Sequence, residues 1–439
     1  MSDRGWLLIP VSRRRAAGCS LGLMVGLAVL HGVWSPFPAW PAGAAAWTAG
    51  ALLWTRVARA QRVVVTALLA LGLAGMVWGW PHVGSFDWEG ALARNHGMLS
   101  MIAAVSFLRL VSLPRAAHEE ALPTGCAAFV KTLVGVHLFS AVINISTVMI
   151  VGDRLHRRAP LDRSSALLLS RGFSSAALWS PFFAAMATTL TYAPQARLPV
   201  LVAVGLPLAA CALFYTYREL RARDVNALST FHGYPVHAGN LRIPVLLAAG
   251  VFATHELIPS LSVLTVITLL SPLLTFVVLA GRDPLRSVRT MAGHVRDRLP
   301  EMSGELVLFL GAGVLATGLA AVVASLGEWS PFTNFDGSSA SATLLAMVAL
   351  AVVGVHPVIT ISVVAVLAQP GTPDPNLLAL TFLMAWSLGA SSSPLSGLHL
   401  ILQGRYGIAG WRFTRWNLGY SIAMLTLGGL VLHGYDWLS

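Results

Sequence analysis

The sequence contains very few charged residues for a chain of 439 residues. Only 11% are Asp, Glu, Lys or Arg, whereas 56% are hydrophobic, and the mean hydropathy is +0.72. A soluble domain of ordinary composition carries about 25% charged residues. This shortage of charge excludes a soluble globular protein and predicts an all-α polytopic membrane protein whose surroundings are the lipid bilayer.

Lysine and cysteine are also scarce. Lys131 is the only lysine among the 29 Lys and Arg residues, and the formal net charge is +11. The arginines occur in short clusters between apolar segments, which is typical of topology signals and argues against a nucleic-acid partner. Cys19, Cys126 and Cys211 lack the spacing of metal ligands, and an odd number of cysteines cannot all pair within one chain. We therefore expect no resident metal site and no cofactor.

The sequence lacks the motifs of the common catalytic sites. It has no His-Glu-x-x-His run, no Cys-x-x-Cys spacing and no glycine-rich phosphate loop. We therefore expect that the protein is not an enzyme. The alternative from this different class is an intramembrane enzyme whose metal site would be built from ionisable residues in or near apolar segments: His255, Glu256, His356 and His399.

Two similar strings of seven residues occur in the two halves of the chain. Residues 142–148 read VINISTV, and residues 358–364 read VITISVV. Ser180-Pro181 and Ser393-Pro394 follow the two strings at comparable distances, each inside a long apolar segment. Paired interruptions at corresponding places in two halves predict the binding site of a secondary transporter.

Apolar stretches of about twenty residues predict eleven membrane crossings. The crossings are expected at residues 17–34, 41–58, 63–80, 97–113, 165–192, 198–217, 243–256, 260–280, 305–326, 376–403 and 416–433. The N-terminus is expected in the cytoplasm because arginines precede the first crossing.

Two further apolar segments are predicted to be re-entrant hairpins. Residues 126–152 have basic residues on both flanks, and since cytoplasmic loops collect Arg and Lys, both ends are expected in the cytoplasm. Residues 339–368 have no Arg or Lys on either flank, so this hairpin is expected to open to the outside. Non-helical backbone at membrane depth is tolerated only beside protein or a water-filled cavity. The tips of both hairpins should therefore line a cavity.

The same order of elements occurs in both halves, but in opposite directions. Two crossings, a hairpin, a crossing that contains Ser-Pro and one more crossing begin near residue 63 heading outward and near residue 260 heading inward. This order predicts two inverted-topology repeats with broken helices at residues 165–192 and 376–403. The expected regions are N-terminal transmembrane helices at 1–62, the first repeat at 63–217, a basic cytoplasmic linker and extra helix at 218–259, and the second repeat at 260–439.

This arrangement resembles the ion transporter superfamily, which includes divalent anion:sodium symporters, arsenite-pump-like permeases and the large membrane subunits of TRAP transporters. The likeness covers most of the chain after residue 63. In the anion symporters a Ser-Asn-Thr motif at each hairpin tip helps to bind sodium and the substrate carboxylate. Residues 144–147 (NIST) and 360–362 (TIS) are partial counterparts. The resemblance implies a homodimer, and it leaves open the alternative of a membrane subunit in a multi-component, TRAP-like transporter.

Two prolines predict where substrate and ion would bind. Pro181 and Pro394 each remove a backbone donor, so each helix should break and free carbonyls for a cation, while the following half-helix offers N–H groups to an anion. The structural alternative is that the serines beside them bond back to their own helix. The candidate substrate-binding and ion-binding residues lie at the two tips and the two breaks: Asn144, Ser146, Thr147, Ser180, Pro181, His356, Pro357, Thr360, Ser362, Ser391, Ser392, Ser393 and Pro394.

His356 is the leading ionisable candidate because it precedes Pro357 at the tip of the second hairpin. Ionisable residues at membrane depth are functional by default, and an imidazole can carry a coupling proton or donate to an anion. The alternative is a histidine bonded to a carbonyl of a neighbouring helix. Together these features predict a secondary active transporter of the bacterial inner membrane that moves a small anionic organic solute with a Na⁺ or H⁺ gradient.

Overall fold

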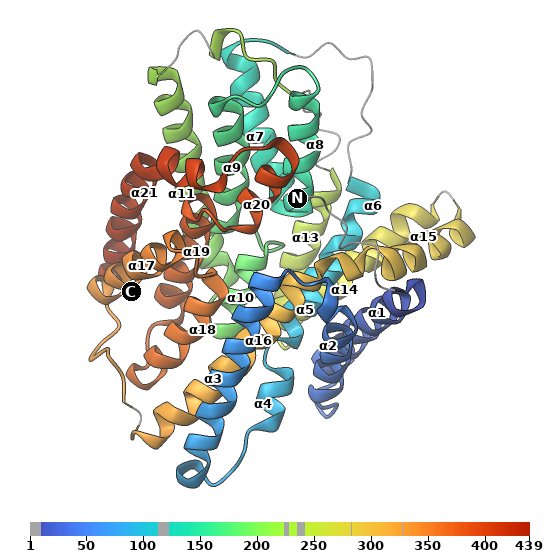
Figure 1. Ribbon diagram of the computed structural model, residues 1–439, viewed down its shortest axis with the longest axis vertical. Coiled ribbons are helices and arrows are strands. Elements are labelled where there is room, and N and C mark those ends of the chain that lie inside the picture. Colours follow the sequence, from blue (N-terminus) through green and yellow to red (C-terminus); the bar gives the residue numbers. More distant parts are fainter. Residues whose placement is uncertain (1–9, 113–122, 224–227, 235–241, 282, 328) are drawn as a thin grey trace. The chain divides into compact units, whose positions relative to one another are not determined.

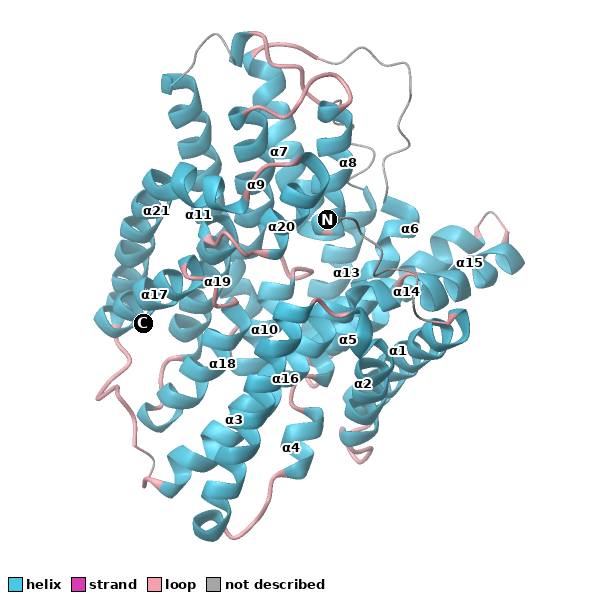
Figure 2. Ribbon diagram, viewed as in Figure 1, coloured by secondary structure: helices cyan, strands magenta, loops and turns pink. Residues whose placement is uncertain are grey.

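The structure is a computed structural model that describes residues 10–112, 123–223, 228–234, 242–281, 283–327 and 329–439. Every regular element within these ranges is a helix (Figures 1 and 2), apart from an isolated bridge between Thr124 and His232. The prediction of an all-α protein is therefore confirmed for the described part of the chain.

Eight of the described helical segments are long and apolar enough to cross a membrane, which supports the predicted multi-pass membrane protein. They are Val11–Val33, Arg59–Val83, Cys126–Ile143, Leu198–Arg223, Val263–Ala280, Pro284–Ser325, Pro375–Tyr406 and Gly410–Leu438.

The count of eight differs from the predicted eleven because four predicted crossings are short or interrupted. Two correspond to the short helices α2 (Trp40–Leu53) and α13 (Arg242–Leu257). The crossings predicted at residues 97–113 and 165–192 are each divided into several helices. One helix adds to the count: α7 (Cys126–Ile143) is long and apolar enough to cross a membrane, although the sequence predicted it as one arm of a hairpin.

The chain forms two compact units, each assembled from segments distant in the sequence. The first unit contains Met1–Val111, Leu246–Pro331 and Ser362–Pro370. Its remaining helices are α1 (Val11–Val33), η2 (Trp54–Arg56), α3 (Arg59–Val83), α4 (Trp88–Ala93), α5 (His96–Val105), η3 (Ser106–Leu108), α6 (Arg109–Ser112), α14 (Val263–Ala280), α15 (Pro284–Asp297), η6 (Leu299–Met302) and α16 (Ser303–Ser325). The amphipathic helix α15 lies between the crossings predicted at residues 260–280 and 305–326, and the sequence analysis did not predict it.

The main helix pair of the first unit is α3 against α16. Small residues allow the two backbones to approach closely: a methyl group on Gly72 would overlap the carbonyl of Val314, and one on Gly318 would overlap the carbonyl of Gly72. Close contact between small residues is a main source of helix association where lipid removes the hydrophobic driving force. Gln61 adds a hydrogen bond from its Nε2 to the carbonyl of Gly304 at 2.8 Å.

The second unit contains Ser112–Val245, Phe332–Ile361 and Gly371–Ser439. Besides α7 its helices are α8 (Ile145–His156), α9 (Arg163–Ser175), η4 (Ala176–Leu178), α10 (Ala184–Tyr192), α11 (Leu198–Arg223), α17 (Gly337–Val352), the first residues of α18 (Pro357–Ala368), α19 (Pro375–Ser392), α20 (Gly397–Tyr406) and α21 (Gly410–Leu438). A short 3-10 turn, η7 (Gln369–Gly371), follows α18.

Helix α19 forms the core of the second unit. It packs against α9, η4, α10 and α11 from the first half of the chain and against α17, α20 and α21 from the second (Figure 1). Nearly all of its residues are buried, including Phe382 and Leu388. A helix that is apolar all round belongs in the interior of a large protein. α19 therefore positions the two Ser-Pro segments of the sequence.

Aspartates define where several helices of this unit begin. The carboxylates of Asp162, Asp336 and Asp374 accept hydrogen bonds from backbone N–H groups in the first turns of α9, α17 and α19, at 2.9, 2.8 and 2.7 Å. Such a cap satisfies one of the N–H groups that a helix leaves unpaired at its start. These carboxylates accordingly lie at helix ends and outside the apolar interior.

Candidate functional site

The first Ser-Pro segment separates α9 and η4 from α10. Pro181 cannot donate a backbone hydrogen bond, and α10 resumes only at Ala184. The hydroxyl of Ser180 donates to the carbonyl of Ala141 in α7 and accepts from the backbone N–H of Phe182 at 3.2 Å. The break is thus joined to the end of α7.

Asn144 forms the junction between α7 and α8, opposite this break. Its φ is +51° and its ψ is −137°, a conformation that asparagine tolerates better than most side chains. Its Nδ2 donates to the carbonyl of Phe182 at 3.3 Å. The structure therefore brings together Asn144, Ser180 and Pro181, which the sequence selected from two separate patterns.

Two buried hydroxyls near this junction have no hydrogen-bond partner among the described residues. Ser140 in the last turn of α7 is 0% exposed, and Thr147 in the first turn of α8 is 2% exposed. Ser146, between the junction and Thr147, is also buried. Leaving a buried hydroxyl unpaired costs about 1–3 kcal/mol. The junction is therefore polar, buried and incompletely satisfied, which is the state expected of a ligand site before it binds.

His137 fixes the side chain that precedes the first break. The indole N–H of Trp179 donates to His137 Nε2 at 3.0 Å, and His137 Nδ1 lies 2.9 Å from the hydroxyl of Ser175. Because an indole N–H only donates, Nε2 must be unprotonated and Nδ1 must carry the hydrogen. Protonation would set two N–H groups against each other. His137 is therefore a neutral imidazole that holds the side chain of Trp179 in place.

The second Ser-Pro segment separates α19 from α20, and its polar groups are already paired. The carbonyl of Ser391 accepts from Asn417 Nδ2 at 2.6 Å, and the hydroxyls of Ser392 and Ser421 lie 2.7 Å apart. The carbonyl of Ser393 lies 2.7 Å from His399 Nδ1. Two carbonyls that the sequence expected Pro394 to free for a cation are thus occupied by side chains of the same unit.

His399 joins the second break to the first half of the chain. Its Nε2 lies 2.9 Å from the hydroxyl of Ser170 in α9, and its ring stacks on Phe413 with 4.1 Å between centroids. Since the Ser393 carbonyl only accepts, His399 Nδ1 carries a hydrogen. A hydroxyl both donates and accepts, so the bond to Ser170 is compatible with either protonation state of His399.

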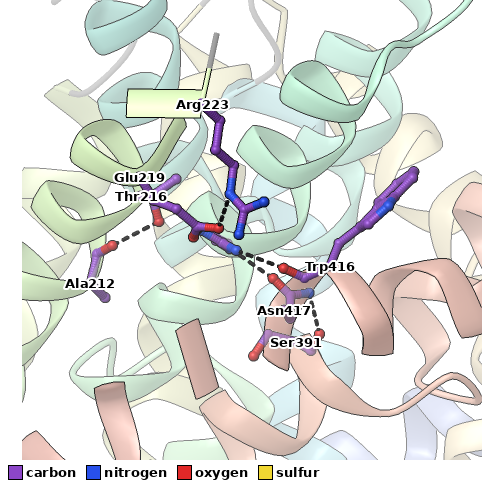
Figure 3. A network of polar contacts seen from close by, with 8 residues as sticks. Ala212, Thr216, Glu219, Arg223, Ser391, Trp416 and Asn417 are labelled. Atoms are coloured by element: carbon purple, nitrogen blue, oxygen red, sulfur yellow. Dashed lines mark hydrogen bonds and ion pairs between the residues drawn. The ribbon is translucent and has the colours of Figure 1, made fainter. Parts of the chain in front are cut away.

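Arg171 is the largest fully buried side chain described, and it lies in the middle of α9. Figure 3 labels Glu219, Trp416 and Asn417, the three residues to which its guanidinium donates hydrogen bonds. Its Nη1 donates to Glu219 at 2.6 Å and its Nε donates to Asn417 Oδ1 at 2.7 Å, while Nη2 reaches the carbonyl of Trp416 at 3.3 Å. The guanidinium also stands 4.5 Å from the centre of the Tyr420 ring. A chain of bonds therefore runs from Glu219 to the second break.

The sequence-based selection missed Arg171, Glu219 and Asn417. A signal was present, because Arg171 lies inside the predicted crossing 165–192 and a charge at membrane depth is expensive unless it is paired. Its partners could not be identified in the same way, since Glu219 follows in α11 and Asn417 belongs to the other half of the chain.

The second hairpin segment is differently arranged. The backbone turns at Gly354, where φ is +103°, and α18 begins at Pro357. His356 Nδ1 accepts from the N–H of Val358 at 3.2 Å, and its ring lies edge-on to Trp386 at 5.3 Å. The Thr360 hydroxyl donates back to the carbonyl of Pro357 at 3.0 Å.

The remaining candidate of that hairpin, Ser362, is buried, but it lies in the part of α18 that groups with the first compact unit.

The described residues contain no group of three His, Cys, Asp or Glu side chains that could hold a metal ion. No protein-family model matches the chain, and no match to it was found among curated proteins.

Proposed function

We propose that the protein is a secondary active transporter of the bacterial inner membrane that moves a small anionic organic solute with a Na⁺ or H⁺ gradient by alternating access. The observation that carries this proposal is the junction at Asn144, where a helix interruption faces the Ser180-Pro181 interruption beside the unpaired hydroxyls of Ser140 and Thr147. Interrupted helices that meet inside an apolar body are the usual binding sites of secondary transporters.

The chemistry of the junction suits an anion. The N-terminus of α8 has no side-chain cap, and a helix N-terminus carries a partial positive charge. The hydroxyls of Ser140 and Thr147 can each donate one hydrogen bond. An anionic group bound here would satisfy donors that otherwise remain buried without a partner.

Within this proposal, residues 126–152 and 339–368 are re-entrant hairpins in two inverted repeats of an eleven-crossing topology, and the N-terminus is cytoplasmic. The second compact unit, which holds both Ser-Pro breaks, is the transport domain, and the first unit supplies the scaffold of a homodimer. Such a division suits alternating access, in which one part of the molecule moves against the other.

Thr147→Val tests the site because valine keeps the shape of threonine and removes only the hydroxyl. If Thr147 binds ligand, the variant should be at least as stable as the wild type and should lose ligand binding, since deleting an unpaired buried hydroxyl removes a cost. Thr381→Val is the matched control: Thr381 is equally buried in the same unit, but its hydroxyl donates to the carbonyl of Leu377 at 2.9 Å.

The measurement is the thermal stability of the purified protein in detergent with acetate, succinate, citrate, methanesulfonate, sulfate or phosphate. A ligand that binds the folded state raises its stability by mass action. Each anion is tested in Na⁺ and in choline, and at two pH values, so that the ion dependence is measured together with the substrate class. Anions that raise the thermal stability of the wild type should also raise that of Thr381→Val, but they should not raise that of Thr147→Val. An unchanged shift in Thr147→Val would overturn the site.

Uptake into proteoliposomes then distinguishes the two driving ions. The stabilising anion should accumulate with an imposed Na⁺ gradient or with an imposed pH gradient, and not without either. A proton-coupled cycle would use His399 rather than His137, because only the hydrogen bonds of His399 tolerate both protonation states. Binding without accumulation under any gradient would contradict secondary transport.

A further inference from the structure

A basic cavity lies where α9 begins, α11 ends and α21 begins. Its volume is about 540 Å³. Four arginines and two tryptophans line it: Arg163, Arg223, Trp411, Arg412, Arg415 and Trp416. No acidic side chain is among these lining residues, so the cavity is suited to a ligand with negative charge.

Among the described residues, ion pairs offset little of the positive charge of this cavity. Glu219 pairs with Arg223 at 2.9 Å, and it is shared with Arg171 at 2.6 Å. Arg163 and Arg412 take part in no ion pair with a described residue, and the same holds for Arg415. Three of the four arginines are therefore without an ion pair in the described part of the chain.

Arg163 carries the strongest sign of a missing partner. Its Nε is buried and has no hydrogen-bond acceptor among the described residues, while its guanidinium lies 5.6 Å from the ring centre of Trp416. Partial burial, followed by the positive charge of Arg223, holds the pKa of Arg163 below its ordinary value. A phosphate oxygen in the cavity would supply both the acceptor and the opposite charge that Arg163 lacks.

The position of the cavity indicates an amphiphilic ligand. Residues in the first turns of α21 line the cavity, and α21 (Gly410–Leu438) is long and apolar enough to cross a membrane. Trp411, Leu418 and Ile422 recur at helical spacing along one face of α21, and they are 58%, 62% and 57% exposed. Tryptophan is enriched where a spanning helix enters the headgroup layer. A basic cavity thus adjoins an exposed apolar stripe.

We propose that this cavity binds the phosphate headgroup of an anionic phospholipid, with the acyl chains along the apolar stripe of α21. Basic pockets between helices at the membrane surface are suited to phospholipid headgroups, and the planar guanidinium of arginine binds phosphate oxygens in pairs. The three arginines without an ion pair carry enough positive charge to neutralise two phosphates. Cardiolipin, which has two phosphates, should therefore bind more tightly than phosphatidylglycerol, which has one. Phosphatidylcholine, whose headgroup has no net charge, should bind weakly. The lipid site is independent of the proposed transport activity.

The test is native mass spectrometry of the purified full-length protein titrated with cardiolipin, phosphatidylglycerol or phosphatidylcholine. The test variant is Arg412→Gln/Arg415→Gln, and its matched control is Arg157→Gln/Arg158→Gln, which removes the same charge from exposed arginines of the same unit. The test variant should bind cardiolipin roughly thirtyfold more weakly, because each basic residue near an anionic headgroup contributes to binding. The control should bind as the wild type does.

Competition distinguishes a lipid from a soluble anion. Glycerophosphoglycerol, which is the headgroup of phosphatidylglycerol without acyl chains, should displace phosphatidylglycerol poorly, because it cannot cover the stripe of Leu418 and Ile422. Displacement by glycerophosphoglycerol or inorganic phosphate at equal concentration would show a free-anion site and overturn the proposal. Equal binding of phosphatidylcholine, or equal losses in the control and test variants, would also overturn it. Thermal unfolding without lipid verifies that all variants are folded.

Discussion

The two Ser-Pro breaks occupy corresponding places in the sequence, yet their surroundings differ. At the first break, the side chain of Asn144 donates one long hydrogen bond of 3.3 Å, and two buried hydroxyls nearby have no partner among the described residues. At the second, Asn417 and His399 bind the carbonyls of Ser391 and Ser393 at 2.6 and 2.7 Å. Equivalent interruptions of a helix therefore differ in how their polar groups are paired. We call the first the open break, because buried hydroxyls beside it lack partners among the described residues, and the second the fixed break, because side chains bind its carbonyls.

Side chains bind the backbone carbonyls of the fixed break, whereas His137 at the open break binds the side chain of Trp179. Arg171 orients Asn417 by a bond of 2.7 Å, and Asn417 in turn holds the end of α19. Ser170, the neighbour of Arg171 in α9, reaches His399 from the same helix. Side chains of α9 and α21 therefore hold the second break through hydrogen bonds.

The largest effect on this comparison should come from Arg171→Met, which removes the origin of the fixed network. The change leaves Glu219, whose side chain is 10% exposed, without its buried partner. Breaking a buried ion pair typically costs about 3–5 kcal/mol, so the free energy of unfolding in detergent should fall by that amount. Adding Glu219→Gln should restore part of the loss, because no buried carboxylate then depends on the exposed Arg223 alone.

An exposed ion pair of the same unit provides the control. Arg405 pairs with Asp153, and their side chains are 48% and 30% exposed. Arg405→Met should cost no more than about 1 kcal/mol, as is usual for solvent-exposed pairs. If the two methionine variants lose equal stability, the network around Arg171 does not fix the second break.

The next largest effect is expected from His399→Phe. Phenylalanine preserves the stacking on Phe413 but leaves the carbonyl of Ser393 and the hydroxyl of Ser170 without a partner. The free energy of unfolding should fall by about 1–3 kcal/mol. Anion-induced thermal shifts should persist, because the first break is untouched. Loss of those shifts at unchanged stability would place the ligand at the second break instead.

Asn144→Ala and Asn144→Gly test the open break, and only the alanine variant is expected to lose stability. Alanine at the φ of +51° should lower the free energy of unfolding by about 1–2 kcal/mol, whereas glycine adopts this conformation without strain. Both variants lack the amide, so both should lose anion-induced stabilisation. Circular dichroism and thermal unfolding measure the stability of each variant, and anion-induced thermal shifts measure ligand binding. Normal shifts in Asn144→Gly would show that the amide serves only the backbone.

The sequence indicated the all-α class, the membrane environment and the interruptions at Pro181 and Pro394, since each follows from local composition or from the missing proline N–H. It also selected Asn144 from a repeated string. It did not show that the second break is paired, because the partners Asn417 and Ser170 approach from distant segments. Arg171 was visible as a charge in an apolar run, but the role of that charge depends on the tertiary position of Glu219 and Asn417.

The smallest expected effect concerns a feature in which the two broken helices are alike. α9 and α19 each begin after an aspartate cap, with bonds of 2.9 Å from Ser165 to Asp162 and 2.7 Å from Leu377 to Asp374. Asp162→Ala and Asp374→Ala should each lower the free energy of unfolding by about 1 kcal/mol, and the asparagine variants should lose much less. Because a cap acts only on its own first turn, the two losses should agree and ligand shifts should remain. Unequal losses would mean that the asymmetry of the breaks extends to the beginnings of their helices.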